Sequence, residues 1–229
     1  MESPRWHVCA TTTEVHERVI AWIASAAAEA IVMRGVFHIV LAGGETFRAI
    51  YDGLRSVAID WDAWRVYFGD ERCLPGDDLR RNSRMVEVTL LMHVPIPDDQ
   101  IHVIRSELGA QNAAMEYCAT LAQVPEFDLV LLGLGEDGHT ASLFPGMDWG
   151  EGPGAQDALA VYGAPKPPAE RVSLSAIRLS RTRNALFVVT GSGKRNAVQA
   201  WGMDQKLPAS AIRPLTGVDV VLDRSCFGS

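Results

Sequence analysis

The chain has 229 residues, of which 48% are hydrophobic and 21% are charged, and this composition excludes a disordered chain, a collagen-like repeat and a disulfide miniprotein. Its 28 acidic and 21 basic residues give a formal net charge of −7, the opposite of the broad basic surface that nucleic-acid binding uses. A few basic side chains gathered in one cleft can still attract a small anion. We therefore expect a globular protein that does not bind nucleic acid.

The four cysteines, Cys9, Cys73, Cys118 and Cys226, are scattered and form neither a CxxC pair nor a zinc-type cluster with histidine. They are typical of reduced thiols. The first residues lack the basic and apolar regions of a secretory signal, and no apolar run approaches the ~18 residues needed to span a bilayer. We expect a cytoplasmic protein without a metal site or membrane contact.

Helical and strand-like segments alternate along the chain. Apolar residues recur at three- and four-residue intervals from Thr13 to Met33, and Gly35 follows as a C-cap, which predicts an amphipathic helix. Short apolar strands that end in glycine-rich turns are predicted at 36–41, 64–68, 127–132 and 185–189. Further helices are predicted at 46–54, 82–92 and 110–121, and from the turn after residue 189 to about residue 200.

This alternation predicts an α/β fold of the doubly wound, Rossmann-like kind, in which helices cover both faces of a mostly parallel sheet. The stretch from Gly150 to Glu170 is rich in proline and glycine. We interpret it as a surface excursion that can act as a lid, and not as a domain boundary. The prediction is therefore a single domain over residues 1–229.

Ligands of open parallel sheets bind beyond the carboxyl ends of the strands, which directs attention to the turns there. Gly43-Gly44-Glu45-Thr46 can face an anion with its backbone N–H groups, or can simply be a turn that Thr46 caps. The residues before and after the later segment Gly191-Ser192-Gly193-Lys194 do not match those of a Walker loop. The segment suits either a single phosphate group or a solvated turn.

The turn after residue 132 contains Gly133-x-Gly135-x-x-Gly138, which matches the dinucleotide fingerprint. Pro145 follows too soon for the long helix that a pyrophosphate site requires, so we do not predict a dinucleotide. The same turn holds His139 beside Asp137, where an imidazole can act as a general base near pH 7.

The segment Asp70-Glu71-Arg72 and the residue Ser142 are further candidates for catalysis. In Asp70-Glu71-Arg72, successive side chains of a strand end leave opposite faces, so only one of the two carboxylates can face a cleft, and a local ion pair is the simpler interpretation. Ser142 follows His139 closely, but no G-x-S-x-G elbow is present. A water nucleophile therefore fits better than a serine.

Taken together, these segments resemble the ordered motifs of the 6-phosphogluconolactonase family over nearly the whole chain. The most specific is Asp137-Gly138-His139-Thr140-Ala141-Ser142-Leu143-Phe144-Pro145-Gly146. Similar motifs lie at 41–46, 66–73, 171–174, 189–194, 207–210 and 218–223. The resemblance implies a carboxylic ester hydrolase that opens 6-phospho-D-glucono-1,5-lactone in the oxidative pentose phosphate pathway.

The resemblance also implies roles for individual residues. His139 is expected to activate water, and Arg72 either to stabilise negative charge on the carbonyl oxygen or to orient the substrate. Asp137 and Asp70 are expected to tune or orient His139 and the sugar hydroxyls, without a separate role for each carboxylate. The expected phosphate-binding residues are Gly43, Gly44, Thr46, Arg171 and Lys194. No metal is expected, because a lactone is already an activated ester and the sequence contains no cluster of metal ligands. No redox cofactor and no obligate protein partner are expected either.

Two alternatives and one departure accompany this resemblance. Glucosamine-6-phosphate deaminases share the fold, but their histidine segment continues to Ile-x-Phe-Asn-Glu-Pro, whereas residues 140–145 here contain no glutamate. A non-catalytic sugar-phosphate sensor is the other alternative. The family's phosphate turn usually reads Gly-Gly-Ser-Thr-Pro, whereas this chain has Glu45 and Phe47 around Thr46. Since a carboxylate would repel a phosphate, Glu45 is expected to point away.

Overall fold

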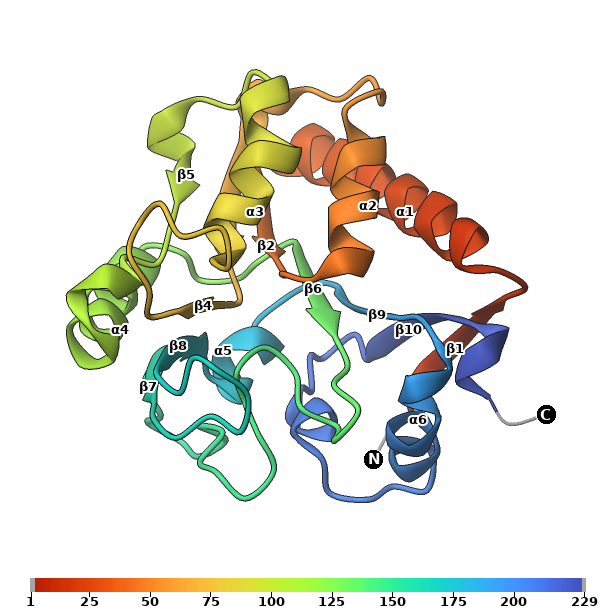
Figure 1. The fold of residues 1–229 in the computed structure, drawn as a ribbon. Coiled ribbons are helices and arrows are strands. Elements are labelled where there is room, and N and C mark those ends of the chain that lie inside the picture. The colour runs from red at the N-terminus through yellow and green to blue at the C-terminus, as the bar shows by residue number, and fades with distance from the viewer. Residues whose placement is uncertain (1–2, 228–229) are drawn as a thin grey trace.

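In the computed structural model, which describes residues 3–227, a seven-stranded sheet crosses the molecule (Figure 1). Every hydrogen-bonded pair of neighbours in this sheet is parallel, which confirms the predicted α/β architecture. The strands in spatial order are β1 (Arg5–Cys9), β10 (Val218–Asp223), β9 (Ala185–Val189), β6 (Leu129–Gly133), β2 (Phe37–Leu41), β3 (Trp64–Phe68) and β5 (Ile101–His102).

The strand order changes direction between β2 and β6. From β2 the chain moves outward to β3 and β5, and it then returns to the other side of β2 with β6, β9 and β10. Such a switch point leaves a crevice beyond the carboxyl ends of the two strands, because the connections on either side run away from each other. The turns after β2 and β6 both open into this crevice, which is where the sequence predicts the site.

Helices cover both faces of this sheet, as predicted (Figure 1). The longest, α1 (Thr12–Arg34), is capped by the Thr11 side chain and ends at Gly35, whose φ of +73° is the left-handed conformation that favours glycine. The others are α2 (Glu45–Leu54) and α3 (Asn82–Thr89) on the same side, α5 (Ala176–Ser180) and α6 (Arg195–Gly202) on the opposite side, and α4 (Ala110–Leu121) against a second sheet.

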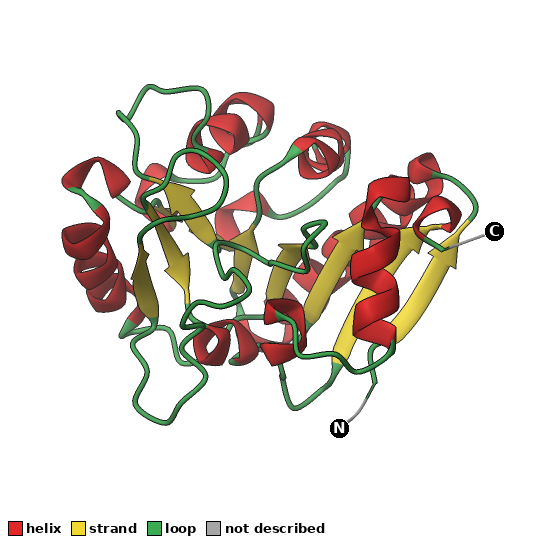
Figure 2. Cartoon of the chain, turned by 60° about the horizontal axis from the view of Figure 1, so that its bottom comes forward, coloured by secondary structure: helices red, strands yellow, loops and turns green. Residues whose placement is uncertain are grey.

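The second sheet corrects the prediction that residues 150–170 are only a loop. It contains three short antiparallel strands in the order β4 (Asp70–Arg72), β8 (Arg171–Leu174) and β7 (Ala158–Val161), visible beside the main sheet in Figure 2. Glycines and prolines lie on both sides of β7, and β7 is nevertheless a four-residue strand that pairs with the buried β8. The pairing of β4 with β8 sets Arg72 opposite Arg171 and so brings two distant basic residues together.

One continuous cluster of buried apolar side chains extends from α1 through the main sheet to the second sheet. Val172 and Leu174 of β8 belong to it, as do Val40 of β2 and Leu131 of β6. This shared core fixes the second sheet against the first, so that the residues of β4 and β8 are held rigidly beside the crevice. Among residues 3–227, no helix combines the length and apolar character needed to traverse a bilayer.

Candidate active site

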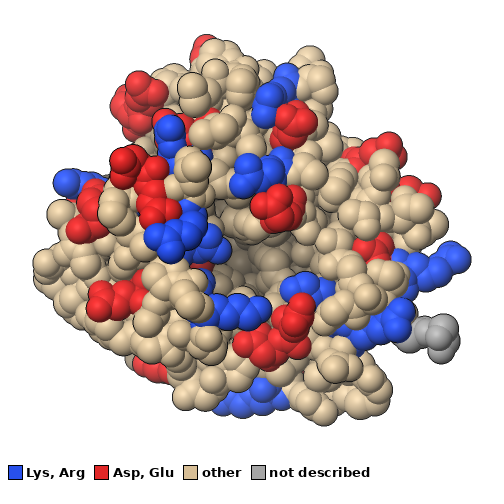
Figure 3. Space-filling view, in the orientation of Figure 1, with Lys and Arg blue, Asp and Glu red and all other residues tan. Residues whose placement is uncertain are grey.

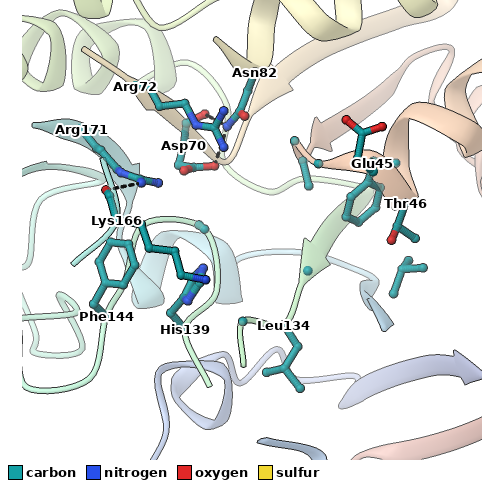
Figure 4. Close-up of a pocket in the computed structure, with 18 of the residues that line it drawn as sticks. Glu45, Thr46, Asp70, Arg72, Asn82, Leu134, His139, Phe144, Lys166 and Arg171 are labelled. Atoms are coloured by element: carbon teal, nitrogen blue, oxygen red, sulfur yellow. Dashed lines mark hydrogen bonds between the residues drawn. The ribbon is translucent and has the colours of Figure 1, made fainter. Parts of the chain in front are cut away.

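A pocket of about 410 Å³ lies at the carboxyl ends of the central strands (Figures 3 and 4). The turns after β2, β3, β6 and β9 all contribute to its walls, and β8 and the loop before it close one side. Of the nine residues predicted for the site, eight line the pocket, namely Gly43, Gly44, Thr46, Asp70, Arg72, His139, Arg171 and Lys194. Asp137, the ninth, does not line the pocket but is hydrogen-bonded to His139.

The imidazole of His139 is held by Asp137, two residues earlier in the same turn. Nδ1 of His139 lies 2.5 Å from Oδ1 of Asp137, and the same oxygen accepts the backbone N–H of His139 at 3.2 Å. Burial raises the pKa of Asp137, but the hydrogen bond and charge of His139 outweigh it and hold that pKa below its usual value. The carboxylate therefore stays ionised and leaves Nε2 of His139 free for proton transfer.

Two neighbours give the imidazole its position. A Cβ atom at Gly135 would lie 2.0 Å from Nδ1 of His139, so only glycine lets the ring pack against the backbone here. On another side, the ring of Phe144 lies 4.8 Å from the imidazole, centroid to centroid. Gly138 is not followed by a helix, and the next strand or helix along the chain is β7.

The structure separates the surroundings of the two predicted aspartates. Oδ2 of Asp70 accepts the hydroxyl of Ser142 at 2.6 Å, and Oδ1 accepts the side-chain amide of Asn82 at 2.9 Å. Across residues 3–227 no hydrogen bond joins Asp70 to His139, so of the two aspartates only Asp137 is hydrogen-bonded to the imidazole. The Ser142 hydroxyl is buried and donates to Asp70.

Glu71 confirms that only one of the adjacent carboxylates faces the pocket. It is fully buried and accepts three backbone N–H groups, those of Arg72, Asn82 and Ser83, at 2.7 to 2.9 Å. The Nε atom of Arg81 lies 3.6 Å from the same carboxylate. Glu71 therefore ties β4 to the start of α3 and supports the wall that carries Asp70 and Arg72.

Four basic side chains give the pocket a positive character within an acidic protein, and basic groups surround the hollow in Figure 3. Three were predicted, namely Arg72, Arg171 and Lys194, and the fourth is Lys166. Burial lowers the pKa of Arg171, with Asp70 opposing and Arg72 adding to the effect. Sequence reasoning missed Lys166 because it lies in the segment that was interpreted as a surface excursion.

The turn after β2 forms the opposite wall. Gly44 has a φ of +108°, and Thr46 in the first turn of α2 shares a 2.8 Å hydrogen bond between its hydroxyl and that of Thr190. Glu45 is 86% exposed at its side chain and pairs with Arg48 at 3.3 Å. Its carboxylate is directed away from Thr46 in Figure 4, but Glu45 still lines the pocket, so the prediction that it points away holds only with respect to Thr46.

The turn after β9 supplies Lys194. Gly191 has a φ of +92°, and its N–H donates to Asp223 at 2.9 Å, which fixes the turn against the end of β10. Burial lowers the pKa of Lys194, Glu136 opposes this effect, and the neighbouring ammonium of Lys166 reinforces it. No group of three or more metal-ligating side chains is arranged to hold an ion within the described part of the chain.

An α/β crevice that combines a carboxylate-oriented histidine with several basic side chains defines a protein that acts on small phosphorylated molecules. Comparison with known proteins places the chain more narrowly. It belongs to the family of glucosamine-6-phosphate isomerases and 6-phosphogluconolactonases, whose model matches residues 10–221.

Several curated relatives are similar over most of the chain. A protein of Oryza sativa named probable 6-phosphogluconolactonase 3, chloroplastic, is 33% identical in an alignment that covers 88% of this chain and 68% of the relative. The 6-phosphogluconolactonase of Rattus norvegicus is 35% identical over 198 residues, with 80% and 76% covered.

Solved structures show the same fold. The 6-phosphogluconolactonase of Trypanosoma brucei is 28% identical, with a TM-score of 0.88 over 99% of this chain and 98% of that one. A monomeric glucosamine-6-phosphate deaminase is 17% identical and reaches a TM-score of 0.85 over 97% of this chain and 98% of that one. The fold alone therefore does not separate the two activities.

Proposed function

We propose that this protein hydrolyses 6-phospho-D-glucono-1,5-lactone to 6-phospho-D-gluconate, the lactonase step of the oxidative pentose phosphate pathway. The observation that carries the proposal is the Asp137–His139 pair in a pocket that holds four basic side chains. The names of the curated relatives support the lactone as substrate.

His139 is the general base in this proposal. With Nδ1 bonded to Asp137, its Nε2 atom takes a proton from water as the oxygen of that water attacks the lactone carbonyl. The same atom then returns the proton to the ring oxygen as the carbon–oxygen bond breaks. General-base assistance of this kind contributes about 10²–10⁴-fold to the rate.

Arg72 and Asp70 are proposed to act on the substrate itself. The guanidinium of Arg72 donates one N–H to the backbone oxygen of Arg80, and its remaining donors can stabilise the negative charge that develops on the carbonyl oxygen. Asp70 uses one acceptor position of each oxygen for Ser142 and Asn82. A carboxylate has about four such positions, so Asp70 can still accept a sugar hydroxyl.

The phosphate is proposed to bind to the Gly43–Gly44 turn, Thr46 and Lys194. Holding this remote group places the lactone carbonyl near His139, which lowers the entropic barrier to the reaction.

Hydrolysis of an activated ester requires neither a metal nor a redox cofactor. We place the enzyme in the cytoplasm, which is supported by the four cysteines, all of them free thiols in the structure.

The test is the hydrolysis rate of freshly generated lactone with wild-type protein, His139→Ala and a matched control, His93→Ala. Within residues 3–227, the ring of His93 is hydrogen-bonded only to the backbone oxygen of Val88, and it lies outside the pocket. We expect clear acceleration by the wild type and the control, and a fall of about 10²–10⁴-fold in the His139 variant. A wild-type rate equal to spontaneous opening would refute the proposed function.

The same preparation separates the lactonase from the deaminase. Incubation with glucosamine 6-phosphate is expected to release no ammonia, because residues 140–145 lack the additional glutamate of the deaminase motif. Ammonia release without lactone hydrolysis would reverse the assignment.

A further inference from the structure

Asn82 is a pocket residue whose side chain has a functional group left over. It is the first residue of α3, and only 3% of its surface is exposed. It nevertheless lines the pocket, where Figure 4 shows it beside Asp70 and Arg72. Its backbone N–H donates to Glu71 at 2.7 Å, which fixes the start of the helix. Because a buried amide needs partners for its NH2 group and for its oxygen, the contacts of Asn82 indicate what it can bind.

The NH2 group of the Asn82 side chain is directed at Asp70. Nδ2 donates to the backbone oxygen of Asp70 at 3.0 Å and to its carboxylate Oδ1 at 2.9 Å. A carbonyl oxygen and a carboxylate oxygen can only accept, so the NH2 group must face Asp70 and the amide oxygen must face away from it. The orientation of the Asn82 amide is therefore fixed by its chemistry.

The amide oxygen of Asn82 has no donor. Among residues 3–227, no N–H or O–H group is hydrogen-bonded to Oδ1 of Asn82. The chain leaves space for this oxygen at Gly43, where a Cβ atom would lie 2.0 Å from it. Gly43 does not have a positive φ, so this close approach, and not the backbone conformation, explains the glycine. An acceptor that is withdrawn from water and lacks a donor favours a ligand that supplies one.

The chemistry of this wall determines which part of a ligand it can hold. Asp70 and the oxygen of Asn82 present acceptors side by side, and Asp70 keeps free acceptor positions beside its bonds to Asn82 and Ser142. A phosphate oxygen is itself an acceptor, so it does not suit this wall. Hydroxyl groups can donate, and the lactone of the proposed function carries them on three neighbouring ring carbons, C2, C3 and C4. Two adjacent acceptors suit two of these neighbouring hydroxyl groups.

We propose that Asn82 is a further substrate-binding residue, whose Oδ1 accepts a hydrogen bond from one ring hydroxyl while its NH2 group holds Asp70 in position for a second. The pair would then recognise the sugar ring and not the phosphate. The identity of the ring rests on the proposed function. The preference of this wall for a hydroxyl donor rests on the contacts of Asn82 alone.

The first experiment compares wild type with Asn82→Ala and a matched control, Asn112→Ala. Asn112 is exposed on α4, donates to the backbone oxygen of Leu108 at 3.4 Å and lies outside the pocket. Calorimetry measures the affinities for 6-phosphogluconate and inorganic phosphate. Loss of the hydroxyl contact is expected to weaken 6-phosphogluconate by about 10-fold in Asn82→Ala and to leave inorganic phosphate unchanged. Equal weakening of both ligands would overturn the proposal, and the control is expected to match the wild type.

The second experiment separates direct binding from an effect through Asp70. Initial rates give kcat/KM for the full lactone and for its 2-, 3- and 4-deoxy forms with wild type, Asn82→Ala and Asp70→Asn. Removal of a hydroxyl costs less in a variant that has already lost the partner of that hydroxyl, so the two losses are not additive. We expect Asn82→Ala and Asp70→Asn to be coupled most strongly to different hydroxyl groups. Strongest coupling of both to the same hydroxyl, or coupling of Asn82→Ala to none, would show that Asn82 only supports Asp70.

Folding is controlled by thermal melting of each variant. Asn82→Ser gives a second measurement of the same loss, because its side chain ends one bond short of the position of Oδ1. If wild type does not accelerate lactone opening, but Asn82→Ala selectively weakens 6-phosphogluconate, the proposed function fails and the role of Asn82 stands. If wild type hydrolyses the lactone, and both Asn82 variants keep the wild-type KM and affinities, the role of Asn82 fails and the function stands.

Discussion

Replacement of Gly135 by alanine tests the importance of imidazole position without removing any catalytic group. The added Cβ would lie 2.0 Å from Nδ1 of His139 and 2.6 Å from Oδ1 of Asp137. Since side-chain carbons do not approach such atoms within 3.0 Å, the pair must move by about 1 Å. A misplacement of this size lowers a reaction rate by about 10²-fold. Gly135 does not have a positive φ, so the alanine introduces no backbone strain that would itself lower the rate.

The assay is the initial rate of lactone hydrolysis by Gly135→Ala, together with its thermal midpoint. The control is Gly202→Ala, because a Cβ at Gly202 would meet no atom within 4 Å. We expect kcat to fall about 10²-fold in the first variant and to stay at the wild-type value in the second. A Gly135→Ala enzyme with wild-type kcat would refute the argument that close packing on this glycine sets the position of His139.

Three further predictions concern other contacts. Asp137→Asn is expected to lower kcat by about 10²-fold or more without a large change in KM, measured by initial rates, because the amide no longer fixes the imidazole as an ionised carboxylate does. In Gly43→Ala the Cβ would lie 2.0 Å from Oδ1 of Asn82, and urea titration is expected to show a loss of about 1–3 kcal/mol as that buried amide is displaced. Burial raises the pKa of Asp219, but hydrogen bonds led by that from Arg5 lower it overall, so its stabilising effect is present above about pH 4 and is lost as the pH falls further. Urea titrations at pH 7 and pH 3 are expected to differ less for Asp219→Asn than for the wild type.

The main sheet is predictable from the sequence because its central strands are continuous apolar runs. The predicted strands at 64–68 and 185–189 coincide with β3 and β9, and the predicted helix at 110–121 coincides with α4. Buried parallel strands produce this pattern directly, since both of their faces contact helices. The edge strand β1 was missed because Arg5, His7 and other half-exposed residues interrupt any apolar run.

The second sheet was not predictable in the same way. Its strands have three or four residues, and they pair across long separations, as between Asp70 and Ser173. No periodic pattern can develop over so few residues. Because β7 was missed, the segment after it was taken as an excursion, and Lys166 was not considered as a pocket residue.

The residues that meet in the pocket were predicted from turns far apart in the chain, whereas the hydrogen bonds between distant segments were not. His139 and Asp137 are two residues apart, and their contact is a property of one turn. The contacts of Asp70 come from Asn82 and from Ser142, which is 72 residues away, and they depend on how β4 packs against the rest of the molecule. A sequence therefore identifies chemical groups within a turn, whereas the division of roles between Asp70 and Asp137 requires the fold.

An acidic protein can attract an anionic substrate only if the carboxylates near the pocket are already engaged. A fifth carboxylate of these turns, that of Glu136, acts on Lys194 and raises its pKa against the effect of burial. The other four each have donors of their own, so their charges are locally compensated. Their partners are Arg48 for Glu45, Asn82 and Ser142 for Asp70, Arg81 and three backbone N–H groups for Glu71, and His139 for Asp137. Among residues 3–227, neither Lys166 nor Lys194 forms a salt bridge, so the pocket keeps basic side chains that can attract an anion.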